Sequence, residues 1–324
     1  KYPSEMIPEG HEVAREQFVL NGNSYFSGQK STTGAIDMKE ENNVLFFTCG
    51  DVRISFNKRN GELNGYRYQD KMLLGHAPQP QFWRAPTDND FGNRMGVLCN
   101  VWRTAGQNKE FKGMNVERKD GAVTLTSIYY LRDVASDYTV KYTVYADGRV
   151  EVNGSWKAGN IALPEIPRFG MQMTLAQEFD QFSWYGRGPW ENYSDRNTAS
   201  FIGKYTSTVD EQYVAYIRPQ ENGNKTDVRW LTLTNKEGFG LRIDGLQPLS
   251  VSALRNYPED FDAGLTKSQR HINDINPRKA VVLHVDLAQR GVGGDNSWGM
   301  YPHEPYLLKA KEYTYGYVIS PVVK

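Results

Sequence analysis

The sequence predicts an all-β protein built as a large antiparallel β-sandwich. About a dozen or more short runs of apolar or alternating residues recur along the chain, as expected for β-strands. The dipeptides Asn60-Gly61 and Asp147-Gly148 separate pairs of such runs, and both favour tight hairpin turns. Helical periodicity is rare. Many strands, hairpin turns and almost no helices are typical of a sandwich rather than of an α/β fold.

The predicted strands follow one another closely. Residues 44–48 are almost wholly apolar, and residues 52–56 alternate with period two before the turn at 60–61. The other predicted strands are 63–68, 123–131, 138–144, 150–156, 171–175, 182–185, 228–233, 239–243, 249–253, 280–287 and 313–319. Only 97–105 and 264–272 are predicted as short helices. The strand runs show no internal repeat, which disfavours a propeller.

Composition and charge disfavour several classes of partner. Lys and Arg together number 38, as do Asp and Glu, so nothing in the net charge favours nucleic acid or an anionic membrane. The mean hydropathy is −0.64, and no apolar run approaches the length of a membrane span. Because the chain begins at Lys1 rather than at a methionine, we expect a processed form or a piece of a longer protein. The compartment, cytoplasmic or periplasmic, stays open.

The residues that commonly bind metals show no metal-binding spacing. Cys49 and Cys99 are far apart; one disulfide could join them, but two buried thiols are the favoured interpretation. None of the five histidines is paired at metal spacing, and His284 is predicted to be a satisfied core residue of an apolar strand. The Asx-rich stretch 88–92 fails the calcium-loop pattern because Gly92 occupies a ligand position. The sequence predicts no metal site.

Four polar segments rich in aromatic residues interrupt the strand pattern. They are residues 82–90, 185–196, 216–223 and 291–299. Each combines Pro or Gly with carboxylates, amides and aromatic rings, which suits loops that their own hydrogen bonds hold rigid. In the last segment, four glycines in nine residues surround Trp298. Such a tryptophan is either a plug for the core or a platform for a ligand such as a sugar.

Several carboxylates in and near these segments are of the residue types that catalyse glycoside hydrolysis. Glycoside hydrolysis needs two carboxylates that face each other across the scissile bond. The candidates by residue type are Glu191, Asp195, Glu221, Asp295 and Glu304. Arginines and amides accompany most of them, so ion pairing and turn capping are favoured over catalysis for each. The sequence contains neither a nucleophile elbow nor a phosphate-binding loop, and it assigns no catalytic residue to this chain.

Together, the four segments resemble the C-terminal domain of the large bacterial β-galactosidases of glycoside hydrolase family two. The matching motifs are RAPTDND (84–90), GRGPWENYSDR (186–196), YVAY (213–216) followed by PQENG (219–223), and GVGGDNSW (291–298). They occur in the family's order and with similar spacing. The resemblance implies a galactose mutarotase-like supersandwich over residues 29–324. It also implies that residues 1–28 are a linker and the tail of a preceding immunoglobulin-like domain.

The resemblance further implies a division of labour between domains. The family's two catalytic glutamates, and its magnesium and sodium ligands, belong to a TIM-barrel domain earlier in the polypeptide, so this region is expected to be non-catalytic and without a cofactor. Trp298 matches the tryptophan that stacks on a lactose-like β-galactoside at the mouth of the barrel. Its loop is expected to be held by Asp295, Asn296 and Ser297. The barrel and the sugar are the expected partners, and a homo-oligomer of the full enzyme stays open.

No chemical role follows from the resemblance for the remaining polar residues of the motifs, Glu191, Arg196, Arg218 and Glu221. Two alternatives share the fold class. An aldose 1-epimerase would need a general acid and base, for which His271 or His303 with Glu304 could serve. A stand-alone carbohydrate-binding module would bind sugar without turnover, and a purely structural domain would do neither.

Overall fold

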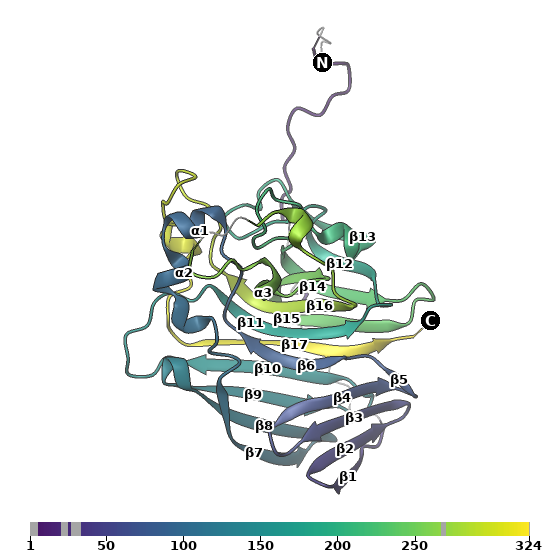
Figure 1. The fold of residues 1–324 in the computed structure, drawn as a ribbon. Coiled ribbons are helices and arrows are strands. Elements are labelled where there is room, and N and C mark those ends of the chain that lie inside the picture. The colour runs from purple at the N-terminus through teal and green to yellow at the C-terminus, as the bar shows by residue number, and fades with distance from the viewer. Residues whose placement is uncertain (1–5, 21–24, 27–33, 267–269, 324) are drawn as a thin grey trace.

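The computed structural model describes residues 6–20, 25–26, 34–266 and 270–323, and it confirms the all-β antiparallel architecture (Figure 1). The strands form one five-stranded and one twelve-stranded sheet. The smaller sheet is a meander, in the order β1 (Asp37–Glu41), β2 (Val44–Cys49), β3 (Val52–Asn57), β4 (Glu62–Tyr68) and β5 (Lys71–Met72). Each neighbouring pair is antiparallel.

The larger sheet branches at its longest strand, β15 (Gly240–Leu254). Residues 240–245 of β15 pair with β17 (Tyr313–Val322), and residues 250–254 pair with β16 (Ala280–Gln289). One branch continues through β17, β10 (Val150–Lys157), β9 (Ser136–Val144), β8 (Ala122–Leu131) and β7 (Lys109–Lys119). The other continues from β16 to β11 (Arg168–Ala176) and β6 (His76–Gln81). Beyond β15 lie β14 (Lys225–Thr234), β12 (Gln181–Gly188) and β13 (Phe201–Thr208).

The hydrophobic core follows from alternation along these strands. Every second residue of β9 is buried, and the same period recurs in β8, β10 and β12. Because successive strand residues point to opposite faces, this pattern directs one face of each strand into a single core. The largest side chains there include the fully buried Trp102, Trp156 and Trp184.

Helices are few and short in the described part of the chain. They are α1 (Asp88–Gly92), α2 (Met95–Leu98) and α3 (Pro258–Phe261), with 3₁₀ turns η1 (Asn100–Trp102), η2 (Arg132–Val134), η3 (Asp210–Gln212), η4 (Ile272–Asp274) and η5 (Glu304–Tyr306). None of the helices within the described ranges is long and apolar enough to cross a membrane.

The predicted strands are confirmed, and the differences concern one strand boundary, both predicted helices and several strands that were not predicted. Residues 239–243 and 249–253 belong to one strand, β15, rather than to two. The predicted helix 97–105 is split between α2 and η1. The predicted helix 264–272 is wrong for residues 264–266, which are not helical, while 267–269 lie outside the described residues. Strands β1, β5, β6, β7 and β13 were not predicted. Prolines or many polar residues mask the period of β1, β6, β7 and β13, and β5 has only two residues.

The N-terminal residues 6–20 run away from the sandwich without forming a strand (Figure 1). They are attached at Gln17, whose side-chain amide accepts from the Ile202 N–H at 2.7 Å and donates to the Ile202 carbonyl at 2.9 Å. Ile202 lies on the edge strand β13, so this amide takes the place of a neighbouring strand at one position. The predicted domain boundary at 28/29 lies outside the described residues and stays a prediction.

Candidate functional site

The four polar segments, although far apart in the sequence, meet at one end of the sandwich. A hollow of about 160 Å³ lies between them and takes wall residues from all four. Its lining residues are Thr87, Asp88, Asn89, Tyr193, Arg196, Tyr216, Gln220, Glu221 and Val292. Hydrogen bonds and ion pairs within and between the four segments hold this hollow in shape.

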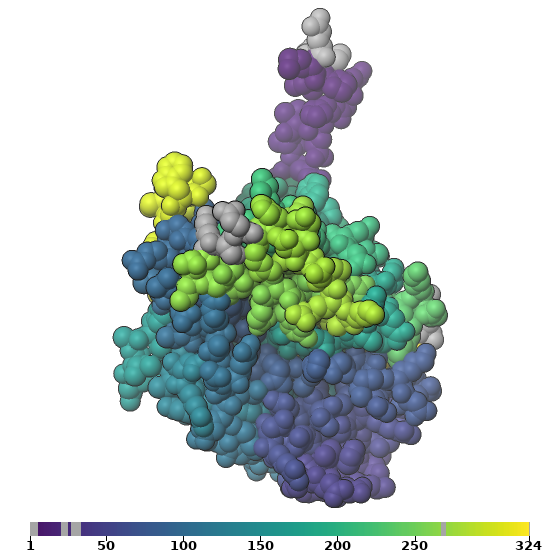
Figure 2. Space-filling model, in the orientation of Figure 1, coloured from purple at the N-terminus to yellow at the C-terminus, as the bar shows by residue number. Residues whose placement is uncertain are grey.

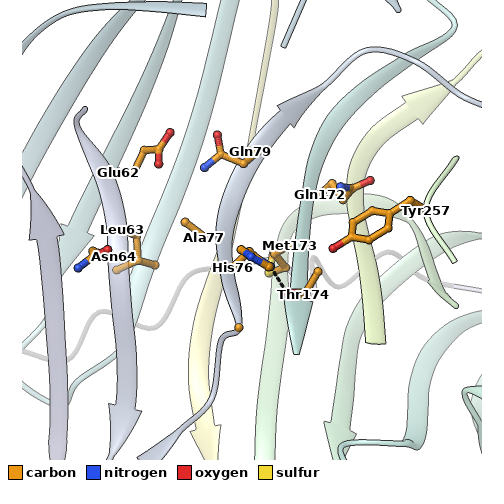
Figure 3. A pocket seen from close by; sticks show the side chains of 11 residues that line it. Glu62, Leu63, Asn64, His76, Ala77, Gln79, Gln172, Met173, Thr174 and Tyr257 are labelled. Atoms are coloured by element: carbon orange, nitrogen blue, oxygen red, sulfur yellow. Dashed lines mark hydrogen bonds between the residues drawn. The ribbon is translucent and has the colours of Figure 1, made fainter. Parts of the chain in front are cut away.

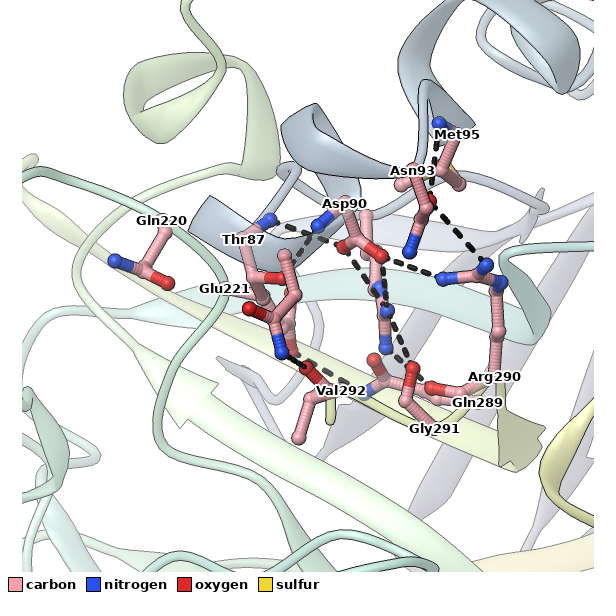
Figure 4. Close-up of polar contacts among 12 residues, drawn as sticks. Thr87, Asp90, Asn93, Met95, Gln220, Glu221, Gln289, Arg290, Gly291 and Val292 are labelled. Atoms are coloured by element: carbon pink, nitrogen blue, oxygen red, sulfur yellow. Dashed lines mark hydrogen bonds and ion pairs between the residues drawn. The ribbon is translucent and has the colours of Figure 1, made fainter. Parts of the chain in front are cut away.

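The first anchor is a buried cluster formed by Arg84, Asp90 and Arg290 (Figure 4). Asp90 accepts from Arg84 Nη2 with both carboxylate oxygens at 3.0 Å and from Arg290 Nη1 at 2.6 Å. Arg290 also pairs with Glu165 at 2.8 Å. Because Arg84 donates to the carbonyl oxygens of Arg290 and Gly291, the cluster ties the segment 82–90 to the base of the Trp298 loop.

Asp90 is itself held by the start of α1. The Thr87 hydroxyl accepts from the Asp90 N–H at 3.2 Å, and Asp90 accepts from the Thr87 N–H at 3.0 Å. This reciprocal capping box satisfies two N–H groups that a helix start would otherwise leave unpaired. The sequence Thr-Asp-Asn-Asp therefore forms a capped helix start, as the turn-capping interpretation of this stretch expected.

A second buried cluster surrounds Arg168 at the start of β11. Its guanidinium pairs with Glu221 at 2.9 Å and with Asp286 at 3.2 Å, and it donates to His284 Nδ1 at 2.8 Å. Burial, and then Arg168, lowers the pKa of His284 well below its usual range, so the ring is neutral and accepts this bond. The prediction that His284 is a satisfied core residue is confirmed.

Glu191 forms the third anchor, between the second and third segments. It accepts from Arg196 at 2.6 Å, from the Gly223 N–H at 2.7 Å and from the Tyr216 hydroxyl. Next to it, the Asn192 backbone N–H donates to the Asn224 carbonyl oxygen at 2.8 Å, and the Asn224 side-chain amide donates to the Asn192 carbonyl oxygen at 2.8 Å. Two loops separated by some thirty residues in the sequence are thereby locked together.

On the exposed side, Asp88 joins the first segment to the third. It accepts from Arg218 at 2.7 Å and from Gln220 at 3.1 Å, and the Arg218 guanidinium lies 4.4 Å from the centre of the Phe91 ring. Glu191, Arg196, Arg218 and Glu221, for which the sequence assigned no role, thus all hold the loop framework in this structure.

Trp298 projects from this framework at the tip of its loop. Its side chain is 77% exposed, so the core-plug alternative is wrong for Trp298. Figure 2 shows the yellow C-terminal part of the chain that includes this loop protruding beside the blue segment of α1 and α2. Trp190 is also exposed, at 64%, whereas Trp83, Trp102, Trp156 and Trp184 are buried.

The backbone around Trp298 is held from two sides. Asn296 accepts from the N–H groups of Trp298 and Met300, at 3.1 and 3.3 Å, so its side chain shapes the turn. Asp295 instead bonds to His303 at 2.7 Å, and Ser297 is exposed. On the other side, a Cβ added to Gly92 would lie 2.7 Å from the Trp298 carbonyl group, which means that α1 packs directly under the loop.

The loop glycines serve close packing more than unusual backbone angles. A Cβ at Gly291 would meet Asp195 Oδ2 at 2.6 Å, and one at Gly294 would meet the Met300 carbonyl at 2.6 Å. Asp195 in turn accepts from the Gly293 N–H at 2.8 Å. The second segment therefore also contacts the Trp298 loop, and side chains larger than hydrogen would separate them.

Four of the five candidate carboxylates are paired with another ionisable side chain. Glu304 pairs with Lys309, and His303 pairs with Asp295. His271 lies at the start of η4, where its N–H donates to Asp274. The side chains of His303 and Glu304 are thus each bound to another residue, whereas His271 makes its bond through its backbone N–H. Among the described residues, no group of three or more His, Cys, Asp or Glu side chains gathers that could hold a metal ion.

Cys49 and Cys99 are both free and buried, as the favoured interpretation expected. Burial raises the pKa of the Cys49 thiol to about 11 and that of Cys99 to about 12. Both thiols therefore remain protonated and unreactive near neutral pH.

Sequence reasoning missed the arginines at the centres of the two buried clusters, Arg168 and Arg290. Neither belongs to a recognised motif segment, although Arg290 immediately precedes the glycine-rich loop. For Arg290, the available signal was its position between an apolar predicted strand and a polar loop. The carboxylates that these arginines bind come from distant segments, so the sequence alone could not pair them.

The chain belongs to the β-galactosidase small-chain family, whose family model matches residues 48–319. It is 37% identical over 314 residues to a β-galactosidase of Priestia megaterium, covering 97% of this chain and 30% of that protein. It is also 30% identical over 308 residues to a β-galactosidase of Halalkalibacterium halodurans and 28% identical over 323 residues to one of Streptococcus thermophilus. The chain spans about 30% of the length of these relatives.

Among solved structures, a galactose mutarotase related enzyme from Lactobacillus acidophilus is similar. The match has a TM-score of 0.44 and 10% sequence identity, and it covers 88% of this chain and 97% of that one. At this level the similarity says nothing about function.

Proposed function

We propose that this chain is the C-terminal, non-catalytic part of a β-galactosidase of glycoside hydrolase family two. The full-length retaining enzyme would hydrolyse terminal β-D-galactosides. Membership of the small-chain family and coverage of about 30% of the relatives support a part rather than a whole enzyme. The carboxylates of the four loops support it too. Glu191 and Glu221 are ion-paired with arginines, rather than facing each other across an open cleft.

In this proposal, Trp298 is one wall of the galactoside-binding site, and a barrel domain supplies the rest. The observation that carries it is an aromatic ring 77% exposed at the tip of a loop whose base is fixed by buried ion pairs. A ring presented on a rigid support loses little conformational freedom when a sugar stacks on it. Stacking contributes about 0.5–1.5 kcal/mol beyond the buried area, or roughly a factor of ten in affinity.

The surface next to this loop is the proposed contact with the barrel domain. Val97 and Leu98 of α2 are 46% and 48% exposed, and Met300 beyond the Trp298 turn is 46% exposed. The Asn93 amide donates to the Met300 carbonyl at 3.4 Å, so the segment leading into α2 and the loop form one continuous edge. Exposed apolar side chains clustered beside a polar rim are typical of an interaction surface.

The magnesium and sodium ions expected from the resemblance would be held by the barrel domain. No step of the reaction is assigned here to groups of this chain beyond binding and orienting the sugar. An interaction of this kind acts on substrate binding more than on bond cleavage, because the ring touches the sugar before and after the reaction.

The decisive experiment is Trp298→Ala in the full-length enzyme. We expect the KM for lactose to rise several-fold, up to about tenfold, with a much smaller change in kcat. Trp298→Phe, which retains a ring, should lie between the wild type and the alanine variant. Trp190→Ala, at another exposed tryptophan, is the matched control and should leave KM unchanged. An unaltered KM in Trp298→Ala would contradict the proposal.

The isolated chain provides a second test. It should not release the chromophore from a chromogenic β-galactoside when purified free of host enzyme. Turnover by the isolated chain would show that it carries catalytic groups of its own.

A further inference from the structure

A larger hollow of about 420 Å³ lies on different elements from the Trp298 loop (Figure 3). Its walls come from β4 of the small sheet, from β6 and β11 of the large sheet, and from Tyr257 at the start of α3. The hollow therefore lies where the two sheets adjoin. No step of the proposed galactoside hydrolysis uses it.

The strand composition keeps this cleft open. β4 and β6 are in contact, but β4 pairs with β3 and β5, whereas β6 pairs with β11. Within β6, Pro78 and Pro80 lack an N–H group, so the strand cannot offer a regular ladder of donors to a second neighbour. The two sheets consequently do not merge here, and the space between them is a permanent feature of the fold.

The cleft presents amide groups with unused hydrogen-bonding capacity. Gln172 on β11 accepts only a long bond of 3.4 Å from Gln81, and its own N–H groups have no partner within the described ranges. Gln79 accepts from Lys109 through its oxygen, and its N–H groups are likewise available in this part of the structure. Asn64 on β4 is exposed at the opposite wall. Amides both donate and accept, as hydroxyl groups do.

Histidine and tyrosine complete the lining. His76 bonds through Nδ1 to the Thr174 hydroxyl at 2.8 Å, which leaves Nε2 for a ligand. Tyr257 is half-buried, and Figure 3 shows its hydroxyl directed towards Met173 and Thr174. A ring beside several amides suits a ligand that has both C–H faces and hydroxyl groups.

The charges around the cleft are balanced. Glu62 is paired with Lys109 at 3.0 Å and accepts from Asn60 at 2.9 Å. Arg278, whose guanidinium lies 5.2 Å from the centre of the Tyr257 ring, is paired with Asp260 at 2.6 Å. With both cations neutralised, the cleft offers little attraction to phosphates or nucleic acids, and its polar walls do not suit an apolar ligand.

We propose that this cleft binds a neutral mono- or disaccharide at a second site, separate from Trp298. The amides of Gln79, Gln172 and Asn64 hydrogen-bond to its hydroxyl groups, and Tyr257 contacts a C–H face. Because the cleft is open and several of its polar side chains are exposed or half-buried, binding is weak, with dissociation constants in the millimolar range. The site does not depend on the barrel domain or on the Trp298 loop.

The test is calorimetric titration of the 324-residue chain with lactose and with methyl β-galactoside, supported by saturation-transfer NMR. We expect weak, saturable binding that falls at least tenfold in Gln172→Leu. Asn64→Ala, at an exposed position, should weaken binding severalfold without affecting folding. The matched control is Gln181→Leu on β12, which lies outside the cleft and should bind like the wild type. Thermal unfolding of each variant checks that the fold is intact.

Trp298→Ala separates this site from the proposed platform. Binding to the isolated chain should be retained in Trp298→Ala and lost in Gln172→Leu. The reverse pattern would assign the binding to the Trp298 loop and overturn the cleft site, while leaving the proposed function standing. The inference is also overturned if the wild-type chain shows no saturable binding or if the cleft variants bind like it.

Discussion

Two buried carboxylates near the candidate site, Asp90 and Asp286, both lie beside arginines but meet different surroundings. Asp90 receives four hydrogen bonds, from Arg84, Arg290 and the Thr87 N–H. Asp286 lies 3.2 Å from Arg168, yet neither of its oxygens has a hydrogen-bond partner among the described residues. Both carboxylates are 0% exposed, so burial alone does not explain the difference.

The two carboxylates therefore have different consequences for the fold. Asp90 joins Arg84 and the Thr87 N–H to Arg290, which lies 200 residues further along the chain, and it thereby fixes the base of the Trp298 loop. Burial raises the pKa of Asp286 to about 8, while Arg168 opposes the shift and Glu221 adds to it. Complete hydrogen bonding thus makes Asp90 a rigid link, whereas Asp286, which lacks such bonds, has a pKa that burial raises.

The largest effect is expected for Asp90→Asn. The variant leaves two buried guanidinium groups without their shared counter-ion, which should reduce the free energy of unfolding by about 3–5 kcal/mol. Chemical denaturation measures this loss. Asp88→Asn, two residues away on the same helix, breaks a partly exposed pair with Arg218 and should cost at most about 1 kcal/mol. Equal losses in the two variants would show that Asp90 is no special anchor.

Asp286→Asn should have a smaller effect that depends on pH. A carboxyl group whose pKa is higher in the folded than in the unfolded chain stabilises the fold most at low pH. That contribution is lost as pH rises from the unfolded value of 3.8 to the folded value of about 8. Above this range the variant should be more stable than the wild type by about 1–3 kcal/mol, and near pH 4 the two should be similar.

Unfolding curves of both proteins, measured across this pH range, check the prediction. A difference of the same size at every pH would mean that Asp286 is ionised throughout and is satisfied by Arg168. The comparison between the two carboxylates would then lose its basis.

The smallest effect on stability is expected for Gly92→Ala. This variant tests whether packing against α1 restrains the Trp298 loop. The added Cβ would lie 2.7 Å from the Trp298 carbonyl, so the loop must shift. We expect faster hydrogen exchange at the amides of Trp298 and Met300, with the free energy of unfolding lowered by about 1 kcal/mol because the exposed loop can shift. Gly96→Ala is the control, because its Cβ would meet only Pro86 at 3.8 Å. Unchanged exchange in Gly92→Ala would indicate a loop that is independent of α1.

Much of the fold was predictable because most strands and turns follow from the pattern of neighbouring residues in the sequence. In strands such as β3 and β9, buried and less buried residues alternate along the sequence. The turns that follow them contain the Gly-containing dipeptides that favour hairpins. Strand β6 was not predictable, because two prolines obscure a segment that only its partner β11 makes into a strand. The break between predicted strands at 239–253 disappeared because β15 pairs with different neighbours along its length.

The candidate site was predictable only in part. Four motifs and one tryptophan marked segments that the structure brings together around one hollow, since polar, glycine-rich loops stand out against strands. The partners within the site were not predictable, because Arg84 and Arg290 are 206 residues apart and Arg168 and Glu221 are 53 apart. Pairing over such separations depends on the arrangement of the sheets.

The sequence by itself determined the all-β class, most of the strands and the segments that form the loops, because alternation and turn chemistry act between near neighbours. Only the tertiary structure decided that Trp298 points outward and that its loop rests on α1. It also decided that Asp90 is shared by two arginines while Asp286 is left without hydrogen bonds. These features depend on which distant groups folding brings within bonding distance. Such contacts between distant residues cannot be predicted from local sequence patterns.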